Sequence, residues 1–316
     1  MNRSKSFLRL AQLIGVAMFA YIVANLDLHV IVDRLKQIQM QWLAVYVLFF
    51  AISLICKSLR WNVVLKVQKA NLSNLRVLSI AMVSSFIGLV TPGRIGEVSK
   101  IGYLREENLS FAKAAVSVVL DRLYDLAILC LLGFVGLVYF SSFFFPDLTT
   151  IVFTAALLAA GISAVFLIRR RLWDLLKMLT QKMISPGSYE SLAEGWGAFK
   201  NEMSAVAVAA APGMLWYTVA AYIFYFGQIY ALALGFGIEV PFVYLALCVA
   251  LSSLLALLPI SVGGLGTREA TFIALLGRIS IPPESAVLIS FSDGVVLGLT
   301  LAAIFALAAS LYLKTR

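Results

Sequence analysis

Residues 91–97 read TPGRIGE, and residues 259–269 read PISVGGLGTRE. Each stretch ends an apolar segment, at 75–90 and at 242–258, that is shorter than the roughly 20 residues needed to cross a bilayer. Proline and glycine leave backbone polar groups without helical partners, which membrane depth tolerates only inside protein or beside water. We therefore predict that each stretch belongs to a re-entrant helical hairpin. The alternative is two short full spans in each case.

The residues that break these two helices are prolines and glycines, and their backbone requires either close packing or a polar cavity. In the first hairpin they are Pro92, Gly93 and Gly96, and in the second they are Pro259, Gly263, Gly264 and Gly266.

The composition places the chain in a membrane. Of its 316 residues, 62% are hydrophobic and only 13% are charged, and the mean hydropathy is +0.96. Such a chain cannot cover its surface with polar groups, which excludes a soluble enzyme, a disordered protein and a secreted disulfide scaffold. The single histidine, His29, argues against a zinc site. We predict neither a metal nor a cofactor.

Apolar stretches of membrane-spanning length occur along the whole chain. We predict an all-α polytopic integral membrane protein with about six transmembrane helices plus the two hairpins. The first stretch follows basic residues, as in a signal peptide, but no convincing cleavage site follows it, so we expect a retained helix. The predicted spans are residues 7–26, 42–64, 114–140, 150–168, 206–234 and 285–313.

Basic residues gather on one side of this topology. They concentrate in residues 1–9, 57–76 and 169–204 and at the C-terminus. The first outside loop holds only Arg34 and Lys36, and the loops at 141–149 and 235–241 contain none. The positive-inside rule then predicts that both termini are cytoplasmic. We expect the membrane to be the plasma (inner) membrane of a prokaryote. The same distribution accounts for the net charge of +9, because basic residues beside membrane spans lie near anionic lipid head groups. We therefore expect lipid head groups as partners and no nucleic acid.

Charged residues repeat at a fixed distance. Glu97 and Glu269 are 172 residues apart, and so are Asp121 and Asp293. Two spans, a hairpin and a span recur in each half, and three crossings invert the second copy relative to the first. Inverted repeats with broken helices are typical of secondary transporters. The alternative is that two similar helix breaks coincide by chance.

We therefore predict a single membrane domain, 1–316, built from two repeats and a linker. Its parts are repeat one at 1–144 with its hairpin at 75–107, a cytoplasmic amphipathic linker at 169–204, and repeat two at 149–316 with its hairpin at 242–280.

Polar residues at membrane depth are costly and usually have a function. Arginine can grip a phosphate through two hydrogen bonds, and a carboxylate can pair with arginine, bind an amine or carry a proton. Such groups can bind a lipid head group, or they can simply clamp the hairpins together. The candidate substrate-binding residues are Arg94, Glu97, Asp121, Arg122, Asp125, Arg268, Glu269 and Asp293.

At these residues the chain resembles the membrane domain of the lysyl-phosphatidylglycerol synthase family. The matching pieces are LRW at 59–61, PGRIGE at 92–97, LDRLYD at 120–125 and GGLGTREA at 263–270. The chain departs from the family pattern at Thr91 and Val262, where that pattern has Asn and Pro. The resemblance implies a flippase-like domain over nearly the whole chain, without the C-terminal synthase domain.

We expect a lipid translocase, either a flippase or a scramblase, that moves an anionic or modified phospholipid or a polyprenyl-phosphate-linked lipid. The head group would cross through a polar gap between the two hairpins. A membrane-embedded enzyme acting on a lipid-linked substrate, with Glu97, Asp121 or Glu269 as acid or base, is the alternative. An accessory scaffold is a third reading. A homo-oligomer and a separate lipid-modifying enzyme stay open as partners.

Overall fold

The computed structural model describes residues 15, 17–144, 189–256, 261 and 264–314. These residues form helices joined by turns, with no β-strand among them, which confirms the predicted all-α class. In chain order the helices are α2 (Leu28–Lys36), α3 (Met40–Val67), α4 (Asn74–Leu89), η1 (Pro92–Val98), α5 (Ser99–Glu106), α6 (Phe111–Phe144), α8 (Tyr189–Gly235), α9 (Phe242–Ala256), α10 (Thr267–Leu276), η2 (Gly277–Ile279), α11 (Pro283–Phe291), η3 (Ser292–Leu297) and α12 (Gly298–Lys314).

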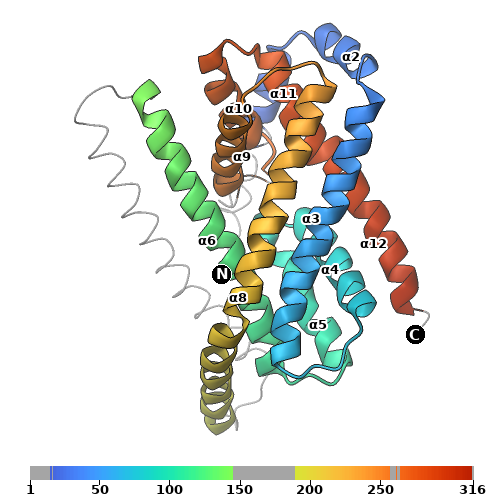
Figure 1. Cartoon of the computed structure of the whole chain (residues 1–316), viewed down its shortest axis with the longest axis vertical. Helices are drawn as coiled ribbons and strands as arrows, with labels where there is room; N and C mark the ends of the chain where they lie inside the picture. Colours follow the sequence, from blue (N-terminus) through green and yellow to red (C-terminus); the bar gives the residue numbers. More distant parts are fainter. Residues whose placement is uncertain (1–14, 16, 145–188, 257–260, 262–263, 315–316) are drawn as a thin grey trace.

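Four of the predicted spans are found, within the described residues, as helices long and apolar enough to cross a membrane. They are α3, α6, α8 and the continuous run of α11, η3 and α12 (Figure 1). Of the predicted helix at 7–26, residues 15 and 17–24 are helical, whereas residues 7–14 and 16 lie outside the described residues. The predicted span at 150–168 lies wholly outside them, and so does most of the loop at 141–149.

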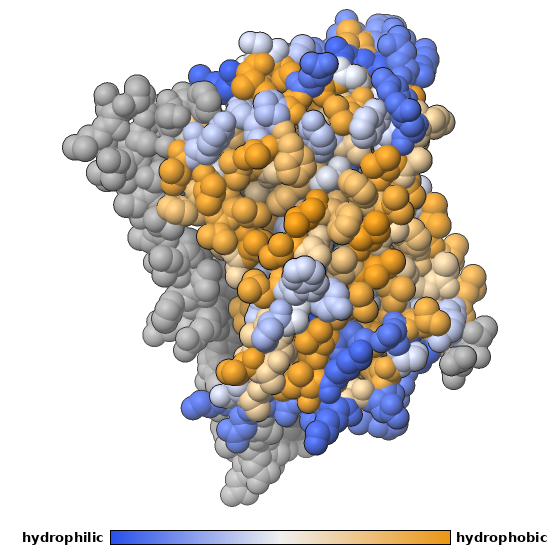
Figure 2. All heavy atoms as spheres, in the orientation of Figure 1, coloured by the Kyte–Doolittle hydropathy of each residue, from blue (hydrophilic) through white to orange (hydrophobic). Residues whose placement is uncertain are grey.

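The surface agrees with a chain that crosses a membrane several times. Figure 2 shows hydrophobic residues in a broad band across the middle of one face, with hydrophilic residues gathered near the upper and lower ends. Such a band is the surface that lipid tails require.

The helix α8 is longer than the predicted span at 206–234. It begins at Tyr189, so the last part of the predicted linker is a helix that continues into the span. The cause is local: residues 189–211 contain many alanines and glutamates, which are strong helix formers. Residues 169–188, the first part of the predicted amphipathic linker, lie outside the described residues.

The first hairpin turns at the predicted break. The apolar helix α4 ends at Leu89 after 16 residues. The Thr91 hydroxyl donates to the Ile87 carbonyl oxygen at 3.0 Å and accepts from the Gly96 N–H at 2.8 Å, which ties the turn to the end of α4. A Cβ atom at Gly96 would lie 2.5 Å from that carbonyl oxygen, so only glycine fits.

The second hairpin uses glycine for its conformation. Gly264 and Gly266 have φ angles of +83° and +85°, a region that residues with a side chain rarely adopt. The helix α10 then covers Thr267–Leu276, within the hairpin predicted at 242–280. Pro259 and Gly263 lie outside the described residues. Re-entry of both hairpins on one side of the membrane stays a prediction.

Helices from the first half of the chain pack against helices from the second half. The helix α3 runs along α8, α4 packs against α12, and α6 packs against α9. In Figure 1, α5 lies near the lower ends of the long helices and α10 near their upper ends. The inverted-repeat organisation itself stays a prediction, but this arrangement brings the polar residues of both halves to the middle of the bundle.

Candidate functional site

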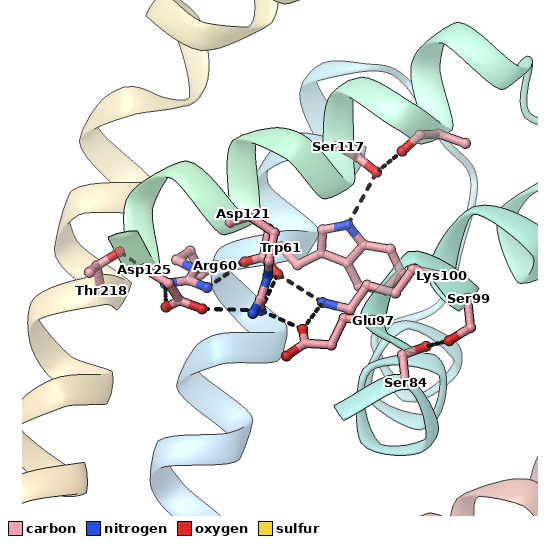
Figure 3. A network of polar contacts seen from close by, with 12 residues as sticks. Arg60, Trp61, Ser84, Glu97, Ser99, Lys100, Ser117, Asp121, Asp125 and Thr218 are labelled. Carbon is pink, nitrogen blue, oxygen red and sulfur yellow. Dashed lines mark hydrogen bonds and ion pairs between the residues drawn. The ribbon is translucent and has the colours of Figure 1, made fainter. Parts of the chain in front are cut away.

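Arg60 lies at the centre of a buried ionic network. Its side chain extends from α3 and is fully buried. Its Nε and Nη2 atoms donate to Asp121 Oδ1 at 2.8 and 2.6 Å, and its Nη1 atom donates to Asp125 Oδ1 at 2.7 Å. The two aspartates are one turn apart on α6 and lie on one helical face. A single arginine thereby holds α3 against α6 (Figure 3).

Two further cations and one glutamate complete this network. Lys100 Nζ donates to Asp121 Oδ2 at 2.8 Å and lies 3.6 Å from Glu97 Oε2. Arg122 forms ion pairs with Glu97 and, at 3.1 Å and three residues along the same helix, with Asp125. Three cations thus face three carboxylates, and their charges cancel. We call this set the Arg60 network; its members are Arg60, Glu97, Lys100, Asp121, Arg122 and Asp125.

Neutral groups surround the Arg60 network. The Trp61 indole donates to the Ser117 hydroxyl at 3.2 Å, and its ring lies 4.9 Å from the Lys100 ammonium. Thr218 on α8 accepts a longer hydrogen bond from Arg60, of 3.5 Å. The network therefore connects α3, α6 and α8 with the first hairpin (Figure 3).

A second polar group, smaller than the first, gathers around Asp293. This residue lies in η3, a π-helical stretch inside the last span, and such bulges are frequent at functional sites. Arg268 Nη2 donates to Asp293 Oδ2 at 2.7 Å. The Tyr46 hydroxyl and the Gln228 amide donate to Oδ1 at 3.0 and 3.2 Å. We call these four residues the Asp293 cluster.

Glu269 is bound by a backbone N–H and a hydroxyl group, whereas its neighbour Arg268 pairs with Asp293. Its carboxylate accepts hydrogen bonds from the Gly266 N–H at 2.6 Å and the Ser290 hydroxyl at 2.7 Å. It caps the N-terminus of α10, where an acidic side chain is favourable. Glu97 likewise pairs with Arg122 and Lys100 rather than with Arg94.

Two glycines leave room for the charged side chains. A Cβ atom at Gly294 would lie 2.8 Å from Arg268 Nη1, and a Cβ atom at Gly88 would overlap the Glu97 side chain. Arg94 itself has a φ angle of +56°, in the left-handed region that a non-glycine residue seldom occupies. Gly294 thus leaves space for the Arg268 guanidinium, and Gly88 leaves space for the Glu97 side chain.

A cavity of about 140 Å³ lies between the Arg60 network and the Asp293 cluster. Seven of the eight candidate site residues line it, and Glu269 does not. Apolar and small side chains of α3, α4 and α12 form other parts of its wall. No group of three or more potential metal ligands occurs within the described parts of the chain.

A sequence profile of the lysylphosphatidylglycerol synthase TM region matches residues 8–308. The chain belongs to this family. This confirms the resemblance drawn from the sequence motifs, and with the apolar helices it makes the chain a multi-pass membrane protein. A UPF0104 membrane protein of Pyrococcus horikoshii is 24% identical over 160 residues, which cover 49% of this chain and 45% of that relative. The chain thus matches less than half of that relative's length.

Several residues of the site are absent from the candidates predicted by sequence reasoning. Arg60 stands in the LRW motif at 59–61, which supports the family resemblance, but its charge also fits a cytoplasmic helix end. Lys57 has the same ambiguity. Tyr46 and Gln228 carry no charge, and nothing in the sequence separates them from other polar residues within spans. One signal was available: Arg60 is flanked by Leu59 and Trp61, which favours burial over exposure.

Proposed function

We propose that this protein is a lipid translocase that moves a lipid with an anionic or modified head group between leaflets. The observation that carries this proposal is the cavity between the Arg60 network and the Asp293 cluster. It is lined by charged groups from both hairpins and from the membrane-spanning helices, within a family named for a membrane domain of a phospholipid-modifying synthase.

The energetics of buried charge support a transport site over an inert core. A charge at membrane depth is costly unless it is paired, and natural proteins keep such charges mainly in pathways for polar cargo. The Arg60 network alone would be enough to clamp α3, α6 and the first hairpin. The cavity with further charges beside it is not needed for that task, and it can accept a head group.

In this mechanism the head group occupies the cavity while the acyl or prenyl tails stay in the surrounding lipid. Arginine and lysine donors replace the water that solvates the phosphate, which lowers the barrier that a bare bilayer presents.

We also propose that the membrane is a prokaryotic plasma membrane and that both termini are cytoplasmic. In the inverted arrangement the two hairpins open to opposite sides. Single-cysteine variants at the exposed positions Glu106 and Ser280, in a background without native cysteines, test this directly. We expect Glu106→Cys to react from the cytoplasmic side and Ser280→Cys from the outside. Reaction of both from the same side would contradict the inversion.

The transport proposal is tested with purified protein in liposomes that contain a fluorescent phosphatidylglycerol. A membrane-impermeant reductant bleaches the label only in the outer leaflet, so translocation appears as bleaching beyond about half of the signal. We expect this with the wild-type protein and much less with Arg94→Ala. Lys66→Met, which removes an exposed cation from α3, is the matched control and should behave as wild type.

A protein that folds but translocates neither labelled phosphatidylglycerol nor a labelled polyprenyl phosphate faster than empty liposomes would contradict the proposal. It would then favour a scaffold for a separate lipid-modifying enzyme. Formation of a new lipid product in the same liposomes would favour an enzyme instead.

A further inference from the structure

The charges that line the cavity do not balance. In the part of the chain that the structure describes, six cationic side chains and four carboxylates line it. The Arg60 network uses three of each, and Arg268 is paired with Asp293. Lys57 and Arg94 are left over, and neither forms an ion pair with a residue that the structure describes. The cavity therefore carries two positive charges in excess.

Lys57 has no counter-ion among the residues that the structure describes. It lies on α3 one turn before Arg60, and its ammonium is 5.3 and 5.6 Å from the ring centres of Tyr225 and Tyr222. An aromatic face stabilises a cation but accepts no conventional hydrogen bond from it. The three N–H donors of Lys57 thus stay free for an anion in the cavity.

Two arginines add donors to the same space. Arg94 has left-handed backbone geometry, a strained conformation that clusters at ligand clamps. Arg268 is nine-tenths buried, and although Asp293 holds one end of its guanidinium, its Nε atom has no hydrogen-bond partner among the described residues. A buried donor without a partner is costly unless a ligand satisfies it.

We propose that the cavity binds a phosphate monoester head group in preference to a phosphodiester. The proposal rests on the proposed function only in placing a head group in this cavity. A phosphate monoester carries about −1.5 to −2 charges at pH 7 and offers three acceptor oxygens. That charge matches the excess of two, and the oxygens match Lys57, Arg94 and the Arg268 Nε atom. A phosphodiester such as phosphatidylglycerol carries one negative charge and leaves one cation unmatched.

Two kinds of lipid share this chemistry, phosphatidate and polyprenyl phosphate, and so does free phosphate. The test measures binding to the purified full chain in detergent, by competition against a fluorescent short-chain phosphatidate. The competitors are dihexanoyl phosphatidate, farnesyl phosphate, dihexanoyl phosphatidylglycerol and inorganic phosphate. We expect at least one monoester lipid to bind about tenfold more tightly than phosphatidylglycerol, the effect of one charged hydrogen bond.

Variants then identify the donors. Lys57→Met should weaken binding of the preferred monoester about tenfold or more and leave phosphatidylglycerol almost unaffected, so that the preference disappears. Lys57→Arg should keep the preference, and Lys66→Met should match wild type. If Lys57→Met does not fold, the comparison of ligands on the wild-type protein still decides the question.

Three results would overturn the proposal: phosphatidylglycerol binding as tightly as both monoester lipids, an unchanged preference in folded Lys57→Met, or inorganic phosphate binding as tightly as the lipids. The transport proposal fails separately. A clear monoester preference in a protein that translocates no lipid would contradict the translocase and leave this inference standing. Translocation without a monoester preference would contradict this inference and leave the translocase proposal standing.

Discussion

The Arg60 network and the Asp293 cluster face the same cavity, but they are built differently. The Arg60 network holds three cations against three carboxylates, with every carboxylate shared between at least two cations. The Asp293 cluster has one ion pair, and its aspartate also accepts from two neutral donors, Tyr46 and Gln228. The first therefore depends on charge balance, while the second keeps hydrogen bonds when its cation is removed.

This difference arises although the two halves place acidic residues at the same spacing. Asp121 and Asp293 are equivalent in that frame, yet the partner of Asp121 is Arg60 and the partner of Asp293 is Arg268. Glu97 joins a network, whereas Glu269 caps its own helix. Equal spacing in the sequence therefore does not determine the partner of a residue. The partner depends on the side chains that pack against that residue from other helices.

The largest effect should follow from removing the hub of the Arg60 network. Arg60→Met leaves Asp121 and Asp125 buried without their main partner, and breaking such a buried pair costs about 3–5 kcal/mol. We expect little folded protein or a strongly lowered melting temperature in detergent. Lys66→Met, on the same helix but exposed, is the control. Normal stability of Arg60→Met would show that the network is not structural.

The equivalent change in the Asp293 cluster should be milder. In Arg268→Met the Asp293 carboxylate keeps its hydrogen bonds from Tyr46 and Gln228, so the loss is close to that of one charged hydrogen bond, about 1.5–3 kcal/mol. We expect a folded protein with reduced lipid translocation. Thermal unfolding measured beside translocation separates the two effects. If Arg268→Met is less stable than Arg60→Met, the comparison between the clusters is wrong.

The two hairpin glutamates should respond unequally. Glu97→Gln removes a charge that faces Arg122 and Lys100, and we expect reduced translocation with a stability loss of about 1–2 kcal/mol. Glu269→Gln can still accept from the Gly266 N–H through its amide oxygen, so both stability and translocation should change little. Equal losses in the two variants would instead restore the expectation that they hold equivalent roles.

The smallest effect on stability should come from Gly294→Ala. Its new Cβ atom would lie 2.8 Å from Arg268 Nη1, the flexible end of a side chain that can move aside. Alanine also favours a helical backbone by about 1 kcal/mol, which offsets the displacement. We expect an unchanged melting temperature but slower translocation. Unchanged translocation would mean that the position of the Arg268 guanidinium does not matter.

The helices could be predicted from the sequence because their signal is local. Runs of apolar residues mark α3, α6, α8 and the last span, and proline and glycine mark the ends of α4 and the start of α10. The long start of α8 was missed because residues 189–204 are polar, and polarity indicates a loop unless helix propensity is weighed as well.

The residues of the candidate site could be predicted more fully than the ion pairs between them. Seven of the eight residues line one cavity, because charged side chains at membrane depth face the interior of the bundle or a polar cavity. The pairings depend on contacts between helices distant in sequence, such as Arg60 with Asp121. Neither periodicity nor spacing contains that information. Lys57 was missed because a lysine near the end of a span most often reaches the interface.

In the proposed mechanism the lipid head group passes through the cavity between the Arg60 network and the Asp293 cluster. Ser85 on α4 lines this cavity, whereas Gly102 on α5 has open space around it. In a cysteine-free background, a bulky thiol reagent on Ser85→Cys should abolish translocation, and dihexanoyl phosphatidate should slow that modification. The same reagent on Gly102→Cys should have no effect. A fully modified Ser85→Cys protein that translocates lipid at its unmodified rate would contradict the account.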